Sequence, residues 1–188
     1  MNELYRLDVL SVSEKYIIPK LNENIEKMKP HFYRDELWYL DHNTETIPVS
    51  DEGGIDIPDV ISFEDLLFFS DKLKKFLEKQ GVDYIFYKKV VISDEVFGIE
   101  EVFWLASVPR IDCIDFERSK IEDKDDYDYN DGIVPFYNIE NPVINPECCG
   151  RYEIFRILGA VSNTVYLKEE LYRKLSNERF IGAGFRKI

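Results

Sequence analysis

The alternation of apolar and polar positions is clearest in the middle of the chain. Ser70 is suited to cap a helix, Leu73 and Leu77 follow one turn apart, and lysines and glutamates fill the opposite face. Gly81 stands where a helix commonly ends. The pattern predicts a helix over residues 70–80 whose leucines face a core.

Aromatic and β-branched residues predict the main strands. The segments 84–92, 99–108 and 152–158 are rich in such residues, and we expect them to be central strands, with a turn over 93–98. Three side chains are expected in the core for this reason: Trp104, Leu105 and Phe155.

The C-terminal segment repeats the first helical pattern. With an offset of 98 residues, Leu73 aligns with Leu171 and Leu77 aligns with Leu175. Both copies have the pattern of a strand end, a helix and a strand, so a second helix is predicted over 168–176. The match suggests two similar strand–helix–strand halves.

The N-terminal part has a weaker pattern. It predicts one or two strands over 4–18, a short polar helix or turn over 20–29 that Pro30 ends, an aromatic strand over 36–43 and a loop over 48–60. With the later elements, the sequence predicts a single α+β domain over residues 1–188, built on a mixed, mostly antiparallel sheet with a few packed helices.

Composition and charge narrow the class of protein. The 188 residues are 45% apolar and 14% aromatic, which is typical of a globular chain that can bury a core. The 37 acidic residues outnumber the 24 basic ones, for a net charge of −13. Such a charge repels nucleic acid and anionic membranes and favours a basic partner.

Targeting patterns and cysteines indicate the compartment. The first residues do not resemble a signal peptide, and no apolar run approaches the ~20 residues that cross a bilayer. Cys113, Cys148 and Cys149 form no C-x-x-C pair, so no zinc site is predicted. Free thiols fit a reducing compartment, and we expect a cytoplasmic protein.

An acidic segment lies between the two halves. Tyrosines stand among its acids, so we expect an exposed loop that is either simply solvated or binds a partner protein. It fails the calcium-loop pattern, because position 6 is Asp131 rather than Gly and position 12 is Tyr137 rather than Glu. The candidate partner-binding residues are Glu122, Asp123, Asp125, Asp126, Tyr127, Asp128, Tyr129 and Asp131.

The residue pattern gives catalysis little support. Asp112 and Asp115 could act as a carboxylate pair, but residues three apart on a strand point to opposite faces, and Arg118 could pair with either acid. Cys113 has no motif that ties it to a histidine base. Phosphate-binding glycine motifs are also missing. We therefore predict no catalytic residue, cofactor or metal.

Four stretches, in the same order, resemble the motifs of one known protein family. WLASVPRIDCIDFERSKIE is similar to its strand with Asp-Cys-hydrophobic-Asp and a following Ser. IPDVISFEDLLFFSDKLKKFLEKQGVDY is similar to its Asp-led segment and Ser-capped helix, and EIFRILG to its Ile-Phe-Arg strand. VYLKEELYRKL with the later GAGF resembles its closing helix and final strand, although Lys168 stands where that helix usually opens with Ser.

This is the eleventh immunity family of polymorphic toxin systems, formerly a domain of unknown function. The resemblance covers about residues 57–188, and residues 1–56 add little to it. It implies a structural role for the motif residues Asp112, Cys113, Asp115, Ser119, Phe155, Arg156 and Gly159.

The resemblance implies an immunity protein without enzymatic activity, which binds and neutralises a cognate toxin in the producer's cytoplasm. If that toxin is basic, the acids would speed encounter and help specificity. Two alternatives stay open: a small hydrolase that uses Asp112 and Asp115, and a regulatory or scaffolding module with an unrelated partner.

Overall fold

The computed structural model describes residues 3–9, 15–33, 43–64, 66–122, 138–160, 162 and 164–188, with the backbone alone for 30–33. Three α-helices lie in these ranges: α1 (Glu23–Tyr33), α2 (Asp71–Lys79) and α3 (Glu169–Glu178). A 3₁₀ turn spans Pro146–Cys149. The strands are β1 (Leu4–Val9), β2 (Glu45–Pro48), β3 (Val60–Phe63), β4 (Leu66–Ser70), β5 (Phe86–Asp94), β6 (Ile99–Ser107), β7 (Arg110–Ile111), β8 (Lys120–Ile121), β9 (Ile139–Asn141), β10 (Ile154–Ile157), β11 (Val165–Lys168) and β12 (Ala183–Lys187).

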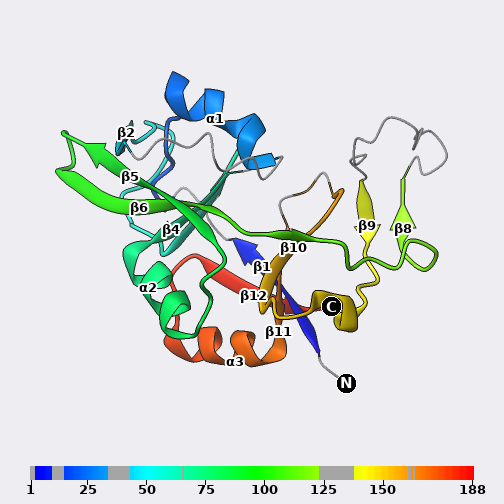
Figure 1. Ribbon diagram of the computed structural model, residues 1–188. Helices are drawn as coiled ribbons and strands as arrows, with labels where there is room; N and C mark the ends of the chain where they lie inside the picture. Colours follow the sequence, from blue (N-terminus) through cyan, green and yellow to red (C-terminus); the bar gives the residue numbers. More distant parts are fainter. Residues whose placement is uncertain are drawn as a thin grey trace.

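The strands form two five-stranded sheets with the orders β12-β1-β11-β10-β7 and β2-β5-β6-β4-β3, and β8 pairs with β9 alone. Neighbouring strands are antiparallel except β2 with β5 and β7 with β10. The predicted α+β, mostly antiparallel fold is confirmed, with two sheets in place of one. The β5–β6 hairpin projects at one end of the molecule and the β8–β9 ladder lies at the opposite end (Figure 1).

Two units of the same topology make up most of the fold. In unit 1, β3 and β4 form a hairpin, α2 follows, and β5 returns parallel to β4 with antiparallel β6 between them. In unit 2, β10 and β11 pair, α3 follows, and β12 returns parallel to β11 with antiparallel β1 between them. The middle strand of unit 2 thus comes from the other end of the chain.

The helices of the two units begin differently and end in equivalent ways. Ser70 caps α2 by accepting the N–H of Leu73 on its hydroxyl at 3.1 Å, whereas Lys168 gives α3 no side-chain cap. Past each helix the chain enters the left-handed region, at Gly81 with φ 83° and at Arg179 with φ 51°. Both the predicted serine cap and the predicted missing cap are confirmed.

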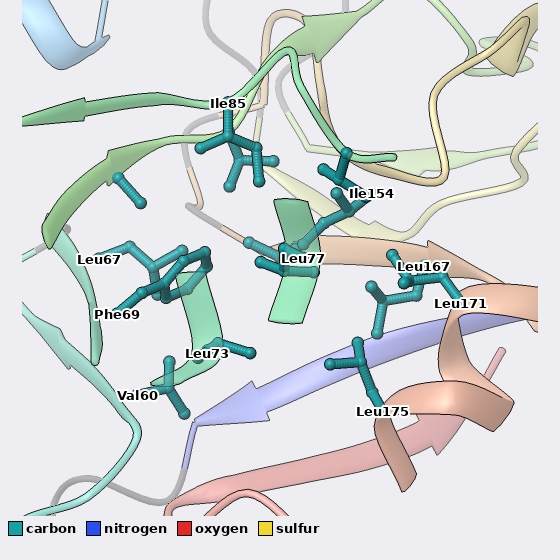
Figure 2. Close-up of a cluster of buried hydrophobic side chains, with 14 of the residues drawn as sticks. Val60, Leu67, Phe69, Leu73, Leu77, Ile85, Ile154, Leu167, Leu171 and Leu175 are labelled. Atoms are coloured by element: carbon teal, nitrogen blue, oxygen red, sulfur yellow. The ribbon is translucent and has the colours of Figure 1, made fainter. Parts of the chain in front are cut away.

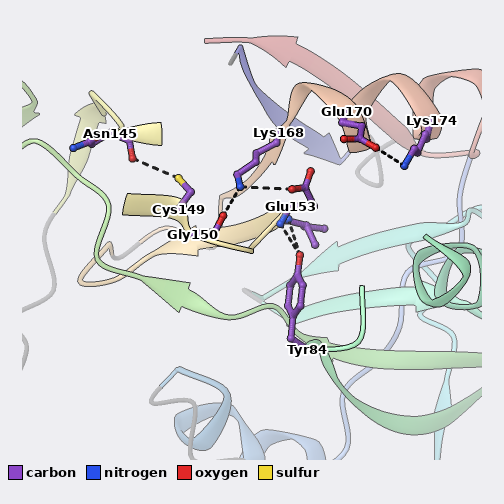
Figure 3. A network of polar contacts seen from close by, with 9 residues as sticks. Tyr84, Asn145, Cys149, Gly150, Glu153, Lys168, Glu170 and Lys174 are labelled. Carbon is purple, nitrogen blue, oxygen red and sulfur yellow. Dashed lines mark hydrogen bonds and ion pairs between the residues drawn. The ribbon is translucent and has the colours of Figure 1, made fainter. Parts of the chain in front are cut away.

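Each unit also holds the other at its first strand. The backbone N–H of Asp59 donates to the carbonyl of Ile181 at 2.8 Å, just past α3 of unit 2. In the reverse direction, the hydroxyl of Tyr84, just past α2 of unit 1, accepts the N–H groups of Glu153 and Ile154 at 2.7 and 3.1 Å (Figure 3). The two units therefore exchange hydrogen bonds at corresponding places.

Three apolar clusters bury the faces of the sheets. The central cluster takes side chains from both helices and both sheets, including Leu77, Leu175, Phe69 and Leu167 (Figure 2). A second cluster lies between the β2–β5 sheet and α1, and a third covers the other face of the β1–β11 sheet. The first four residues of β4 are apolar because their alternating side chains enter both the central and the second cluster.

Two predictions in the described ranges were wrong. Helix α1 continues through Pro30 to Tyr33, so proline does not end it. Trp104 is only half-buried, because α2 covers the neighbouring part of the sheet face and leaves the indole at its edge. Leu105 and Phe155 are fully buried, as predicted. The aromatic strand predicted over 36–43 lies almost wholly outside the described residues.

Candidate protein-binding surface

Asp59 is a buried acid where the two units meet. It precedes β3, and only 7% of its surface is exposed. Its Oδ1 accepts the hydroxyl of Ser70 at 2.8 Å, and its Oδ2 accepts the N–H of Ile181 at 2.8 Å. The ammonium of Lys72 lies 3.3 Å from Oδ2. A buried carboxylate with three donors is satisfied, so Asp59 fixes the start of α2 against unit 2.

A groove of about 700 Å³ opens beside this acid. Its floor is the face of β5 and β6 that α2 leaves open, where Lys89 pairs with Trp104 in register. Its walls come from the start of α2 and from two partly exposed isoleucines, Ile57 and Ile181. The groove combines residues of both units, and the bonds of Asp59 hold its walls in place.

Charged side chains frame the indole of Trp104 in this groove. The indole N–H donates to Oδ1 of Asp71 at 3.2 Å, and the ammonium of Lys74 lies 4.4 Å from the ring centroid. The pKa of Asp71 is lowered, first because Lys75 bonds to it and further because Trp104 does. An oriented aromatic ring with a charged rim is typical of protein-binding sites.

The Asp-Cys-Ile-Asp motif lies outside the groove and organises a turn. The Oδ1 atom of Asp115 accepts the N–H groups of Glu117 and Arg118, each at 3.1 Å. The Arg118 guanidinium is 3.9 Å from its other oxygen. Asp112 is exposed. Both oxygens of Asp115 serve this turn. The geometry of the described residues therefore does not support a hydrolase that uses Asp112 and Asp115.

The same motif holds a second segment of chain beside it. The hydroxyl of Ser119 accepts the N–H of Val143 at 2.8 Å, and the N–H of Asp115 donates to the Val143 carbonyl at 2.8 Å. The carbonyl of Cys113 accepts the N–H of Asn145 at 2.7 Å. These bonds join residues 113–119 to residues 143–145, which lie on either side of the acidic segment in the sequence.

Cys113 and Cys149 meet in the third apolar cluster. Both thiols are buried, whereas Cys148 is exposed. Cys113 donates to Cys149, which raises the pKa of Cys113 and lowers that of Cys149. The Cys149 thiol in turn donates to the carbonyl of Asn145 at 3.6 Å (Figure 3). Among the described residues the vicinal pair forms no disulfide.

The remaining motif residues lie on β10 and just after it. Phe155 is buried and stacks on Tyr166, with ring centroids 5.9 Å apart. The Nε of buried Arg156 donates to the Val108 carbonyl at 2.6 Å, so it ties β10 to the end of β6. Gly159 has a φ of 79°, which favours glycine at this turn.

The predicted partner-binding residues fall mostly outside the described residues. Only Glu122 is described: it is exposed, and its side chain accepts from the amide of Asn138. Residues 123–131 lie beyond the described ranges, so their role stays a prediction. Asp59 and the groove were not predicted from the sequence, because the bonds of Asp59 reach residues as far away as Ile181.

The described residues contain neither a cluster of metal-ligating side chains nor a membrane-spanning helix. No group of three or more His, Cys, Asp or Glu side chains among them could hold a metal ion. None of the helices that are described is long and apolar enough to cross a membrane. The hydroxyl of Ser70, beside the groove, donates to Asp59 and accepts the N–H of Leu73 at the start of α2.

The described residues form an α+β fold of two units with an open groove lined by residues of both. The model of the immunity protein family Imm11 matches residues 25–188, which is most of the chain. The protein therefore belongs to this immunity protein family. The match begins inside α1, so it also includes part of the N-terminal region that the sequence motifs left out. No curated protein matches the chain.

Proposed function

We propose that this protein neutralises a cognate bacterial toxin domain by binding it non-covalently in the cytoplasm of the cell that makes both. The observation that carries the proposal is the family match over residues 25–188. The protein acts as one domain with no reaction of its own. The occupied oxygens of Asp115 and the engaged hydroxyl of Ser70 are consistent with this role.

The charge of the chain supports a basic toxin as the partner. A net charge of −13 attracts a cationic surface and speeds the first encounter, and it makes the association rate sensitive to salt. The acidic residues predicted from the sequence, Glu122 to Asp131, are one proposed part of this attraction.

The test is co-expression with the C-terminal domain of the toxin encoded beside this protein's gene. Cells that make the toxin domain alone should stop growing, and cells that also make this protein should grow normally. The two proteins should then purify together. A neighbouring gene that encodes no toxin, or a toxin domain that neither binds the protein nor is neutralised by it, would contradict the proposal.

A further inference from the structure

The tip of the β5–β6 hairpin exposes two adjacent apolar side chains. Val96 is 86% exposed and Phe97 is 62% exposed, the highest values among the large apolar residues described. Neither belongs to the three buried clusters or packs against them. Their apolar surface therefore contributes nothing to the core, and burying it would favour association with another protein.

The tip is held in one conformation. Strands β5 and β6 stay in register over nine residue pairs, from Phe86 with Ser107 to Asp94 with Ile99. At the turn, Oδ1 of Asp94 accepts the N–H groups of Val96 and Phe97 at 2.7 and 3.0 Å. Because the backbone under both apolar side chains is already fixed, little conformational entropy is lost when they bind.

Acids surround the apolar tip. Glu95, Glu100 and Glu101 are exposed, and no ion pair engages them within the described part of the chain. They remain available to cations on a partner. Behind the tip, the open sheet face carries the half-buried side chains of Val91 and Val102. This face continues into the groove at Trp104.

We infer that this hairpin arm, residues 91–102, is the part of the protein that enters the toxin domain. The inference rests on the proposed function and names the surface that performs it. A projecting element needs a concave partner, so the toxin presents a depression with an apolar floor for Val96 and Phe97. Basic residues at its rim meet Glu95, Glu100 and Glu101, which makes the two charge patterns complementary.

The decisive variant places acids at the tip, as Val96→Asp together with Phe97→Asp. Aromatic and apolar side chains at the centre of an interface carry most of its binding energy, so the dissociation constant should rise at least about 30-fold. The matched control is Ile188→Asp, an exposed isoleucine at the opposite sheet, which should change it less than about threefold. Thermal unfolding should be unchanged in both, because none of these side chains is buried.

Charge reversal separates steering from contact. Glu100→Lys with Glu101→Lys should slow association and reduce its dependence on salt, whereas Glu147→Lys with Glu178→Lys makes the same change in net charge elsewhere and should have a much smaller effect. Binding is measured with the purified toxin domain and this protein in full length, and protection is measured by co-expression.

The outcomes distinguish the inference from the proposed function. If the wild-type protein neither binds the toxin domain nor protects cells, the proposed function is wrong. If the wild type protects and the tip variant binds within about threefold of it, the arm is not the contact surface and the inference is wrong. The inference would also be wrong if charge reversal within residues 123–131 abolished binding while the tip variant bound normally. That result would place the contact on the acidic segment.

Discussion

Unit 1 and unit 2 share a topology but differ in what surrounds their helices. In both units a helix connects two parallel strands, and a third strand lies between these two in the sheet. Both helices contribute leucines at the same spacing to the central cluster. In unit 1 the helix start is locked by Asp59 and Ser70, whereas in unit 2 the equivalent residues are Glu153 and Lys168. The backbone N–H of Ser70 donates to the carbonyl of Asp59 at 2.8 Å, and the backbone N–H of Lys168 donates to the carbonyl of Glu153 at 2.9 Å.

The outer parts of the units differ more than their centres. In unit 1, β5 and the middle strand β6 form a long hairpin that pairs over nine residues, while the equivalent β12 and β1 of unit 2 pair over five. Unit 2 instead carries the turn, the thiol pair and the β8–β9 ladder. The shared helices and strands build the central cluster, whereas the β5–β6 hairpin and the β8–β9 ladder lie at opposite ends of the molecule (Figure 1).

The largest expected effect comes from the leucines that both units place in the central cluster. Leu77→Ala and Leu175→Ala should each lower the free energy of unfolding by about 2–5 kcal/mol, because each leaves a cavity in a shared core. Urea unfolding followed by circular dichroism and by tryptophan fluorescence should give one coincident transition for the wild type and for both variants. Two separate transitions, with one unit unaffected, would mean that the units fold independently.

The next prediction compares the two acids at the helix starts. Asp59→Asn replaces a buried acceptor of three donors, so it should lower the free energy of unfolding by about 2–3 kcal/mol. Glu153→Gln should cost less than about 1 kcal/mol, since its carboxylate is half-exposed and lies 3.5 Å from Lys168. Equal losses in chemical denaturation would show that the two acids have the same structural role.

A smaller effect is expected at the helix cap of unit 1. Ser70→Ala removes the oxygen that accepts the Leu73 N–H, which should cost about 1–2 kcal/mol, and Ser70→Thr should restore most of it. The measurement is again the midpoint of urea unfolding. If the alanine variant were as stable as the wild type, the cap would not stabilise α2. The difference between the capped α2 and the uncapped α3 would then have no effect on stability.

The smallest expected effect on stability comes from removing a tyrosine hydroxyl, at Tyr87 in unit 1 and at Tyr166 in unit 2. Among the described residues the hydroxyl of Tyr87 has no hydrogen-bond partner, so Tyr87→Phe should raise the free energy of unfolding by about 1 kcal/mol at neutral pH. In unit 2 the hydroxyl of Tyr166 bonds to Thr164, so Tyr166→Phe should gain nothing. A loss of stability in Tyr87→Phe would show that its hydroxyl is bonded in solution.

The tyrosine of unit 2 also predicts a pH dependence. Burial raises the pKa of Tyr166 to about 12, whereas an unfolded tyrosine titrates near pH 10. Between these values the unfolded chain loses a proton that the folded chain keeps, so stability present below about pH 10 falls as the pH rises towards 12. Tyr166→Phe should make this fall less steep in unfolding experiments at alkaline pH.

Local patterns predicted much of unit 1 and of α3. The Ser70 cap, the leucine spacing of α2 and Gly81 after it depend on neighbours within one or two turns, and the same spacing located α3. Arg179 takes the left-handed conformation after α3 although its residue type does not predict it. The residue type alone therefore could not fix where α3 ends.

Long-range contacts explain what the sequence did not predict. The apolar character of Trp104 favours a core position, but whether its face of β6 is covered depends on where α2 lies over the sheet. β1 pairs with strands near the other end of the chain, and no local pattern specifies such partners. Val96 and Phe97 did carry a signal, because two apolar residues in a turn break the usual polar pattern.

A titration of toxin activity against this protein tests the central claim most directly. The toxin domain is held at one concentration, increasing amounts of the protein are added, and residual toxin activity is plotted against the molar ratio. Neutralisation by binding predicts a straight decline that reaches zero when the two proteins are equimolar, with active, unmodified toxin recovered after the complex is separated in denaturant. Complete loss of activity at a small fraction of an equivalent, or toxin recovered with an altered mass, would show that the protein acts as an enzyme.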